Sequence, residues 1–368
     1  METLPRIPIK IAFFMRCLMG GGGERVAVNL ANTFARLGYP VDMVLATWSG
    51  TFTNHLRDEI QRVDLQCGHL WQSLPRLIGY LRDRQPDVLI SGLHYPNEIA
   101  ILAKHLSRSQ TRVIVVEHNT LSVESVRAPQ RSAQLTPLSS RLLYPFADRI
   151  VAVSDGVARD LVKTAKLLPQ KISTIYNPII EESFDPKAIQ PAGHPWFDDP
   201  SIPVVVGIGR LMEQKDFLTL LKAVQSVNDS RSVRLLILGE GNQRSCLKNY
   251  IQRHHLSESI QLLGFISEPL CYLKQASVFV LSSQWEGFGN VLVEAMAMGV
   301  PVISTDCPHG PREILNGGEF GHLVPVGDPQ AIAQAIIKVL DGDRRLPPRE
   351  WLSQFTCEHA MSCYLSLV

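Results

Sequence analysis

Along the chain, short runs of Val, Ile and Leu alternate with longer segments in which apolar residues recur every three or four positions. The short runs predict strands that are covered on both faces, and the recurring positions predict amphipathic helices. The first helical segment places four apolar residues on one face, namely Val26, Leu30, Phe34 and Leu37. Gly38 is expected to end that helix. The alternation predicts parallel α/β units.

The alternation occurs twice, and a proline-rich stretch separates the two series. The first series predicts strands at 9–15, 41–46, 87–92, 112–119, 149–154 and 171–176. The second predicts strands at 204–210, 233–241, 260–265, 277–283, 300–305 and 321–326. Asn177-Pro178 ends the first series, and residues 179–203 carry five prolines without clear periodicity. We therefore predict an α/β protein with two Rossmann-like domains, residues 1–180 and 202–345. A linker at 181–201 joins them, and a C-terminal helical segment follows at 346–368.

Composition places the chain among ordinary globular proteins. Its 368 residues are 45% apolar and 19% charged, which allows two separate cores. It has no uninterrupted run of 18 apolar residues, so no membrane-spanning helix is expected. The first residues lack a small-residue cleavage site, which argues against a signal peptide. Seven dispersed cysteines without CxxC spacing predict reduced thiols in a cytoplasmic protein.

Charge is distributed unevenly although the net charge is only +1. Up to Ile180 the chain has 21 Lys and Arg against 14 Asp and Glu, a balance of +7; the remainder has 15 against 21, a balance of −6. The small net charge argues against a nucleic-acid partner. The basic first half indicates that it faces something anionic, and solvated surface charge without a partner remains the alternative.

Four glycines, Gly20–Gly23, follow the first predicted strand and open the first helix. Each glycine adds chain entropy that folding must remove, so four in a row exceed the needs of a turn. Backbone N–H groups of Gly22 and Gly23, at a helix N-terminus, can hold a phosphate. Neither a P-loop Lys-Ser/Thr nor a dinucleotide GxGxxG pattern is present. A flexible turn is the alternative.

Two glutamates, Glu286 and Glu294, flank a glycine-broken turn that opens an apolar helix. Gly287 and Gly289 allow the backbone to approach a ligand closely. Asn290 suits the N-cap of the helix, which places Glu294 about one turn inside it. Carboxylates beside exposed helix N–H groups suit a ligand that carries hydroxyl groups and an anion. Solvated carboxylates on a helix surface are the alternative.

Arg210 and Lys215 follow the first predicted strand of the second series, next to Gly209. Ligands of doubly wound folds bind at the carboxyl ends of the strands. Arg can bind a diphosphate with two parallel hydrogen bonds, and Lys supplies a compact positive charge. These two cations therefore favour an anionic ligand, such as a diphosphate, at this edge. An exposed loop that merely carries two cations is the alternative.

The segment from Gln284 to Ser304, QWEGFGNVLVEAMAMGVPVIS, resembles the E-x7-E signature of the retaining glycosyltransferases of family 4. The resemblance extends over nearly the whole chain and is most specific between Gly207 and Glu313. It implies a GT-B fold, in which two Rossmann-like domains face each other across a cleft. It also implies that the first domain binds the acceptor, the second binds the nucleotide sugar, and the C-terminal helix crosses back to the first domain.

The resemblance also implies roles for individual residues. Glu286 would bind sugar hydroxyls near the reacting carbon, and Glu294 would bind the ribose. His118, at the end of a strand in the first domain, would contact the transferred sugar and the phosphate. The remaining assignments are backbone groups of Gly287, Phe288 and Gly289 for the sugar and distal phosphate, and Phe265 and Ile266 for the base.

These roles predict a retaining glycosyltransferase that moves a hexose or N-acetylhexosamine from a nucleotide diphosphate to a hydroxyl of a lipid-linked or polysaccharide precursor. Residues 305–315, TDCPHGPREIL, resemble bacterial enzymes that use UDP-sugars, so UDP is preferred over GDP. Arg210, Lys215 and oriented backbone N–H groups can stabilise the departing diphosphate, so neither a metal nor another cofactor is expected. Asp341-Gly342-Asp343 falls in a late loop and is not assigned to a metal. An epimerase or hydrolase of the same fold and a non-catalytic nucleotide-sugar-binding protein remain alternatives.

Segment 126–149 carries four arginines among apolar residues. The arginines are Arg127, Arg131, Arg141 and Arg149, and the apolar residues are Leu138, Leu142, Leu143, Tyr144 and Phe146. A basic amphipathic helix of this kind can lie on an anionic bilayer, here at the inner face of a membrane. Packing of the apolar face into the protein core is the other explanation.

Overall fold

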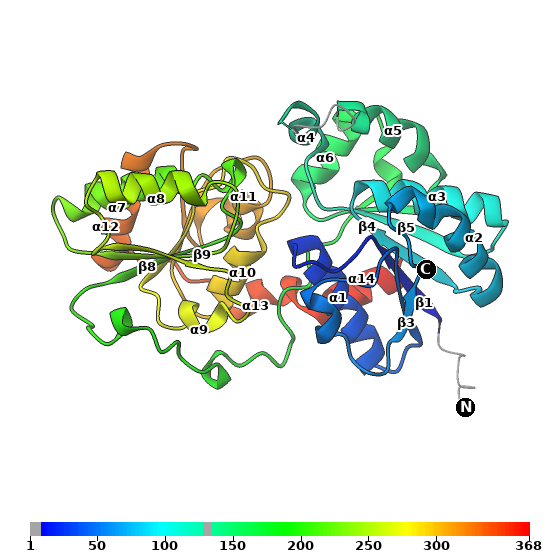
Figure 1. Ribbon diagram of the computed structural model, residues 1–368, viewed down its shortest axis with the longest axis horizontal. Coiled ribbons are helices and arrows are strands. Elements are labelled where there is room, and N and C mark those ends of the chain that lie inside the picture. Colours follow the sequence, from blue (N-terminus) through cyan, green and yellow to red (C-terminus); the bar gives the residue numbers. More distant parts are fainter. Residues whose placement is uncertain (1–8, 128–133) are drawn as a thin grey trace. The chain divides into compact units, whose positions relative to one another are not determined.

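The computed structural model describes residues 9–127 and 134–368, and the chain divides into two compact units. Unit 1 comprises the residues up to Glu182 together with Gln354–Val368, and unit 2 comprises Ser183–Ser353. Each unit is built on its own parallel sheet with helices on both faces (Figure 1). The prediction of two Rossmann-like α/β domains is therefore confirmed.

The sheet of unit 1 has seven parallel strands in the order β3-β2-β1-β4-β5-β6-β7. They are β1 (Ile11–Met15), β2 (Val41–Leu45), β3 (Gln61–Asp64), β4 (Val88–Gly92), β5 (Arg112–Glu117), β6 (Arg149–Ala152) and β7 (Ile172–Thr174). Six of them coincide with the apolar runs that predicted strands. The exception is β3, an edge strand whose sequence QRVD is mostly exposed and therefore lacks an apolar signal.

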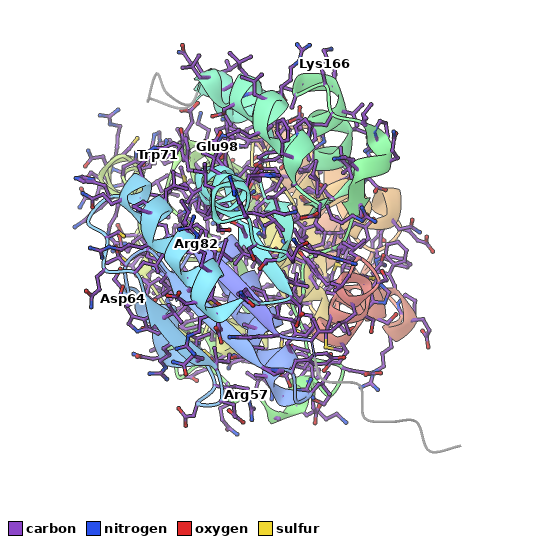
Figure 2. The ribbon with its side chains drawn as sticks, turned by 90° about the vertical axis from the view of Figure 1, so that its right-hand side faces the viewer. Arg57, Asp64, Trp71, Arg82, Glu98 and Lys166 are labelled. Atoms are coloured by element: carbon purple, nitrogen blue, oxygen red, sulfur yellow. The ribbon has the colours of Figure 1, made fainter. Side chains whose placement is uncertain are left out.

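The helices of unit 1 cover both faces of this sheet. They are α1 (Gly22–Arg36), α2 (Ser73–Arg84), α3 (His94–Ser107), α4 (Leu121–Arg127), α5 (Thr136–Leu143), α6 (Asp155–Thr164) and α14 (Cys357–Leu365). Helix α1 buries Val26, Leu30 and Phe34 as predicted, but the prediction for Leu37 is wrong. Leu37 follows the end of the helix and is 47% exposed. Figure 2 shows Glu98 of α3 among packed side chains and the exposed Trp71 near the outline of the molecule.

The C-terminal segment is helical but is not one helix. It forms α13 (Arg349–Leu352), a 3-10 turn at Ser353–Phe355, and α14. The break occurs at Thr356, whose hydroxyl accepts a hydrogen bond from the backbone N–H of His359 at 3.3 Å and so caps α14. Helix α14 packs against α1, where Glu358 forms an ion pair with Arg36 (Figure 1).

The sheet of unit 2 has six parallel strands in the order β10-β9-β8-β11-β12-β13, and all six were predicted. They are β8 (Val204–Ile208), β9 (Arg234–Leu238), β10 (Ile260–Gly264), β11 (Val278–Leu281), β12 (Val302–Thr305) and β13 (His322–Val324). The helices are α7 (Phe217–Asn228), α8 (Arg244–Arg253), α9 (Leu270–Leu273), α10 (Asn290–Ala297), α11 (Pro311–Ile314), α12 (Pro329–Leu340) and α13. The strands adjacent to β8 are β9 and β11, so the loops that follow β8 and β11 emerge side by side.

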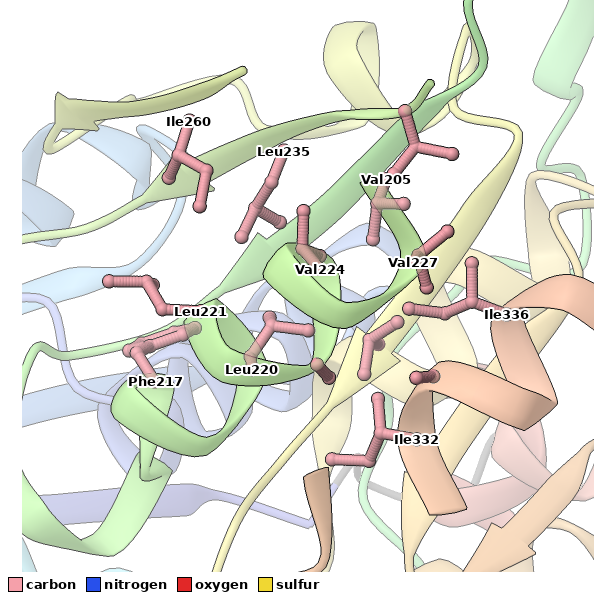
Figure 3. Packing of buried hydrophobic residues seen from close by; sticks show 14 of the residues in the cluster. Val205, Phe217, Leu220, Leu221, Val224, Val227, Leu235, Ile260, Ile332 and Ile336 are labelled. Atoms are coloured by element: carbon pink, nitrogen blue, oxygen red, sulfur yellow. The ribbon is translucent and has the colours of Figure 1, made fainter. Parts of the chain in front are cut away.

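The core of unit 2 lies between this sheet and helices α7 and α12 (Figure 3). Leu220 and Val224 of α7 and Ile332 of α12 are fully buried there. Burial of such a side chain stabilises the fold by about 1.5–3 kcal/mol. This packing holds the strand ends, and the loops that follow them, in fixed positions.

Residues 183–203, which include most of the predicted linker, belong to unit 2. The backbone N–H of Ala192 donates to the carbonyl of Cys271 at 3.2 Å. The ring of His194 packs edge-on against that of Trp196, with 5.5 Å between their centroids. The stretch is therefore attached to the domain that follows it.

Candidate active site

A buried ion pair lies at the carboxyl edge of the sheet in unit 2. Lys215 ends the 3-10 turn after β8, and Glu286 lies in the loop after β11. The Nζ of Lys215 is 2.5 Å from Oε1 of Glu286, and the hydroxyl of Ser283 donates to the same oxygen at 2.6 Å. The side chains of Lys215 and Glu286 are only 14% and 8% exposed. The two predicted residues are thus in direct contact, although 71 positions separate them.

Hydrogen bonds tie the loops on either side of this pair together. The hydroxyl of Ser282 donates to the Lys215 carbonyl at 2.8 Å, and the side-chain amide of Gln214 donates to the Trp285 carbonyl at 3.0 Å. From the neighbouring strand β12, the hydroxyl of Thr305 donates to the Ser283 carbonyl at 2.5 Å. The geometry of the pair is therefore held by three strand ends.

Gly209 and Arg210 complete the loop after β8. A Cβ on Gly209 would lie 3.2 Å from Cε of Lys215, so the missing side chain lets the lysine lie flat along the backbone. Arg210 is exposed, and its guanidinium has no hydrogen-bond or ion-pair partner among the residues that the structure describes. The loop thus carries one paired cation and one cation that is available to an anion.

The glycine-broken turn before α10 differs from its prediction in one position. The N-cap is Gly289, with φ of 104°, and Asn290 is the first residue of the helix; the assignment of Asn290 as N-cap is wrong. Only glycine adopts this φ easily, so it takes the cap position in place of a hydrogen-bonding side chain. Phe288 is 2% exposed, and a Cβ on Gly310 would lie 2.0 Å from its carbonyl oxygen. Phe288 can therefore offer a ligand only its backbone.

Both glutamates of the predicted signature are buried. Glu286 is 6% exposed and Glu294, within α10, is 4% exposed. The alternative of solvated carboxylates on a helix surface is therefore wrong. Burial of two carboxylates costs free energy, which favours a functional role for them.

The remaining predicted residues of unit 2 lie at the end of β10. Phe265 is 60% exposed and Ile266 is half-buried, directly after Gly264 with φ of 83°. Gly264 accepts a backbone hydrogen bond from Gly239 at the end of β9, at 2.7 Å. The exposed ring of Phe265 offers an apolar surface at this edge of the sheet.

Cys307 lies close to the ion pair, but its thiol is expected to be unreactive. It is buried, and burial, with a smaller contribution from the charge of Glu286, raises the pKa of its thiol to about 12. A thiol that stays protonated at neutral pH is a poor nucleophile. Cys307 is therefore a packing residue.

In unit 1, His118 lies at the carboxyl end of β5 and packs against two glycines. A Cβ on Gly23 would lie 3.3 Å from the imidazole carbons, and one on Gly92 would lie 3.3 Å from Nε2. Burial lowers the pKa of His118 to about 4, so the ring is neutral at pH 7. The structure thus brings together Gly23 and His118, which were predicted separately.

The glycine loop before α1 already holds a carboxylate. The backbone N–H groups of Gly20 and Gly21 donate to Oε2 of Glu24 at 2.7 and 3.0 Å. Glu24 is the third residue of α1, and its carboxylate accepts the hydrogen bond from the N-cap Gly21 that forms one half of a capping box; Gly21 has no side chain to form the other half. The N–H groups of Gly20 and Gly21 are therefore occupied by the protein itself, while Gly22 and Gly23, which were predicted to hold a phosphate, are the first two residues of the helix.

A buried polar network next to His118 was not predicted. The hydroxyl of Tyr144 donates to Oε2 of Glu117 at 2.8 Å, and the amide of Asn97 donates to the Tyr144 hydroxyl at 3.1 Å. His94 lies 3.1 Å from Glu98 and 3.4 Å from the Tyr144 hydroxyl. The only sequence signal was Glu117, a charged residue that ends an otherwise apolar strand.

The basic apolar segment of unit 1 is exposed in part: Tyr144 is fully buried, whereas three of its other apolar residues are not. Leu138 and Leu142 of α5 and Phe146 just beyond it are 55%, 60% and 60% exposed. Core packing therefore does not explain these three side chains. Arg141 is exposed beside them, whereas Arg131 and the side chain of Arg127 lie outside the described residues. Among the described residues, no helix is long and apolar enough to cross a membrane.

Within residues 9–127 and 134–368, no group of three or more His, Cys, Asp or Glu side chains is placed to hold a metal ion. Asp341, from the loop Asp341-Gly342-Asp343, forms an ion pair with Arg231 at 2.8 Å. Asp343 pairs with Arg345 at 3.3 Å. Both aspartates serve surface contacts.

Comparisons with known proteins cover both units. Residues 20–183 match the family "Glycosyltransferase Family 4", and residues 194–354 match "Glycosyl transferases group 1". The chain is 31% identical over 346 residues to the N-acetylgalactosamine-N,N'-diacetylbacillosaminyl-diphospho-undecaprenol 4-alpha-N-acetylgalactosaminyltransferase of Campylobacter jejuni, covering 91% of each chain. It is 25% identical to the amylovoran biosynthesis glycosyltransferase AmsD of Erwinia amylovora, covering 83% of this chain and 82% of that one.

Solved structures show the same fold. The Anabaena protein Alr3699/HepE in complex with UDP-glucose superposes with a TM-score of 0.81 at 19% identity, covering 98% of this chain and 100% of the other. A glycosyltransferase from Rickettsia africae gives a TM-score of 0.80 at 18% identity, with 98% of both chains covered. With the parallel sheets of both units and the matches over both, the chain belongs to the GT-B glycosyltransferases of the bacterial polysaccharide type.

Proposed function

We propose that the chain transfers a hexose or N-acetylhexosamine from a UDP-sugar to a hydroxyl of a lipid-linked or polysaccharide precursor, with retention at the anomeric carbon and without a metal. The observation that carries this proposal is the buried pair of Lys215 and Glu286 beside the unpaired Arg210. One cation is fixed by a carboxylate and the other is available to an anion. This arrangement suits a ligand that joins a sugar to a diphosphate.

The chemistry assigns separate tasks to these groups. The bond between the anomeric carbon and the diphosphate oxygen breaks, and the positive charge of Arg210 and Lys215 stabilises the oxygen that leaves. Backbone N–H groups at the N-terminus of α10 add to that stabilisation. Glu286 holds sugar hydroxyls. The acceptor oxygen then bonds to the same face of the anomeric carbon, and its proton passes to the departing diphosphate.

Relatives support the choice of donor and acceptor. The Campylobacter jejuni relative is named for transfer of N-acetylgalactosamine in alpha linkage to a sugar carried on diphospho-undecaprenol. Anabaena HepE has been solved with UDP, with UDP and glucose, and with UDP-glucose. An alpha product from an alpha-linked nucleotide sugar corresponds to retention.

The test is a UDP-release assay with UDP-N-acetylgalactosamine, UDP-N-acetylglucosamine, UDP-galactose and UDP-glucose, each with and without an undecaprenyl-diphosphate-linked sugar. We expect acceptor-dependent release that EDTA does not reduce, and a product whose proton NMR coupling shows an alpha linkage. UDP release at the same rate with and without the acceptor would identify a hydrolase. Tight UDP binding without any turnover would identify a binding protein.

We further propose that the exposed face formed by Leu138, Leu142 and Phe146 contacts an anionic membrane surface. Leu138 and Leu142 are four positions apart in α5, so they lie on one side of that helix. The exposed Phe146 follows just beyond its end, and the exposed Arg141 lies next to Leu142 in the sequence. Apolar groups that enter the interface with a cation beside them suit anionic lipids. A lipid-linked acceptor would then be within reach.

Vesicle flotation tests this contact. Vesicles with phosphatidylglycerol should carry the protein to the top of the gradient at low salt, and vesicles of phosphatidylcholine should not. Replacement of Leu142 and Phe146 by Ser should abolish flotation. The matched control is Leu168→Ser, at another exposed leucine of unit 1 that is 57% exposed. Equal flotation of all variants would refute the assignment.

A further inference from the structure

We propose that Glu117 is a positioning residue for His118, and that Tyr144 holds Glu117 in place. The proposal rests on the proposed function and on the contact with the transferred sugar and the phosphate that the family resemblance implies for His118. Glu117 and Tyr144 themselves make none of the donor contacts assigned above. It is carried by three observations: the direction of the two neighbouring side chains, the burial of the carboxylate, and its partners.

The first observation is that Glu117 and His118 face opposite sides of the sheet. Successive residues of a strand project to opposite faces. His118 faces Gly23 of α1 and Gly92, whereas Glu117 faces Tyr144. The carboxylate therefore cannot bind the imidazole directly, and any influence passes through the backbone that the two residues share.

The second observation is that the Glu117 carboxylate lies near the backbone of the loop that leaves β5. Burial raises the pKa of its carboxyl, while the nearby His94, the Tyr144 hydroxyl and the backbone N–H groups of Asn119 and His118 act in the opposite direction. Those two N–H groups belong to the loop that leaves β5. A carboxylate placed among them restrains the loop from one side, while Gly23 and Gly92 restrain the imidazole from the other.

The third observation is that burial of the Glu117 carboxylate costs folding free energy. Glu117 is 0% exposed, and its Oε1 has no hydrogen-bond partner among the described residues. Replacement of a buried ionic network by apolar side chains is often neutral or stabilising. Its presence beside a candidate active-site histidine is therefore better explained by a fixed position for His118 than by stability of the fold.

Tyr144 is the means by which the carboxylate is held. Its ring is fully buried, and its hydroxyl contacts Glu117 and Asn97 at 2.8 and 3.1 Å. Unit 1 offers a matched control in Tyr80, whose hydroxyl donates to the buried carboxylate of Asp42 at 2.7 Å. Both phenols are buried and both serve a carboxylate, but only Tyr144 serves the one next to His118.

The experiment compares Glu117→Gln, Tyr144→Phe and Tyr80→Phe in the full chain, with UDP release measured from the UDP-sugar that supports the fastest turnover. Glu117→Gln and Tyr144→Phe should lower kcat about 10- to 100-fold, as for a small misplacement of a reacting group, with KM for the UDP-sugar within about twofold. Tyr80→Phe should leave kcat unchanged at a comparable melting temperature. Tyr144→Phe, which removes a single oxygen, is the variant to use if Glu117→Gln does not fold.

A double-variant cycle with His118→Ala decides whether Glu117 acts through His118. If it does, Glu117→Gln should cause no further loss of kcat in the His118→Ala background. A loss that is the same in both backgrounds, or an equal loss in Tyr80→Phe, would overturn this inference and leave the proposed function standing. A His118→Ala variant with normal kcat would instead overturn the role of His118 itself, and this inference with it.

Discussion

Removal of the Lys215 charge should destabilise unit 2 and, separately, slow the reaction. At 2.5 Å and an effective dielectric constant of about 20, the attraction between Lys215 and Glu286 is about 7 kcal/mol before desolvation is counted. Loss of one partner from a buried pair costs about 3–5 kcal/mol, because the other charge stays buried. Ser283 still donates to Glu286, so we expect the lower end, about 3 kcal/mol. Lys215→Met keeps the aliphatic stem that lies along Gly209 and removes only the charge.

Two assays separate the two effects. The melting temperature should fall by roughly 6–12 °C in Lys215→Met, at about 2–4 °C per kcal/mol for a unit of this size. The double variant Lys215→Met/Glu286→Gln removes both charges and should recover most of that loss. Turnover should not recover: kcat/KM for the UDP-sugar should remain about 10- to 150-fold low, which corresponds to a lost hydrogen bond to a charged group of about 1.5–3 kcal/mol.

A pair from unit 1 is the control. Lys10 lies 3.1 Å from Asp42, and Lys10→Met should leave kcat/KM unchanged. If the double variant melts as low as Lys215→Met, the pair is not what holds the loops after β8 and β11. If Lys215→Met turns over within threefold of the wild type, the role of Lys215 at the departing diphosphate is refuted.

Three further predictions follow from the exposure and protonation of single residues. Arg210→Ala should change the free energy of unfolding by less than about 0.5 kcal/mol, yet weaken UDP binding about 10- to 150-fold by calorimetry; unchanged affinity would contradict its role. Because burial lowers the pKa of His118 from 6.5 to about 4, the unfolded chain takes up this proton first as pH falls. Stability should therefore drop by about 1–2 kcal/mol between pH 7.5 and 5, and His118→Gln should flatten that part of the melting curve against pH. At pH 8 a thiol reagent should label the exposed Cys246 in the native protein and leave Cys307 unlabelled until the protein is denatured, because the pKa of Cys307 is raised to about 12.

The strands were predictable wherever burial on both faces left a continuous apolar run. The inner strands of both sheets are almost entirely buried and mostly apolar, whereas the edge strand β3 is not, because an edge strand need not be apolar. The ends of helices were harder to predict from the sequence than the strands. Gly289 replaces Asn290 as N-cap because the backbone there has a positive φ, which the residue pattern alone did not determine.

The strand ends and helix start that carry the predicted site residues were predictable, but the contacts between those residues were not. Lys215 and Glu286 meet because β8 and β11 are neighbours in the sheet, which depends on the strand order and not on sequence distance. The network around Glu117 draws His94 from α3 and Tyr144 from the end of α5. No single segment contains that pattern. Contacts between side chains from several elements therefore could not be predicted from the sequence.

The contact between Lys215 and Glu286 has a consequence for donor binding. A diphosphate that approaches Lys215 competes with Glu286, and Glu286 released from the lysine becomes available to sugar hydroxyls. UDP alone supplies the competing anion but not the hydroxyls, so Glu286→Gln should bind UDP more tightly than the wild type does. A UDP-sugar supplies both, so the same variant should lose part of that gain. Glu286→Gln that weakened UDP and the UDP-sugar to the same extent would show that Glu286 contacts the nucleotide itself, and the division of tasks between the two residues would then have to be reversed.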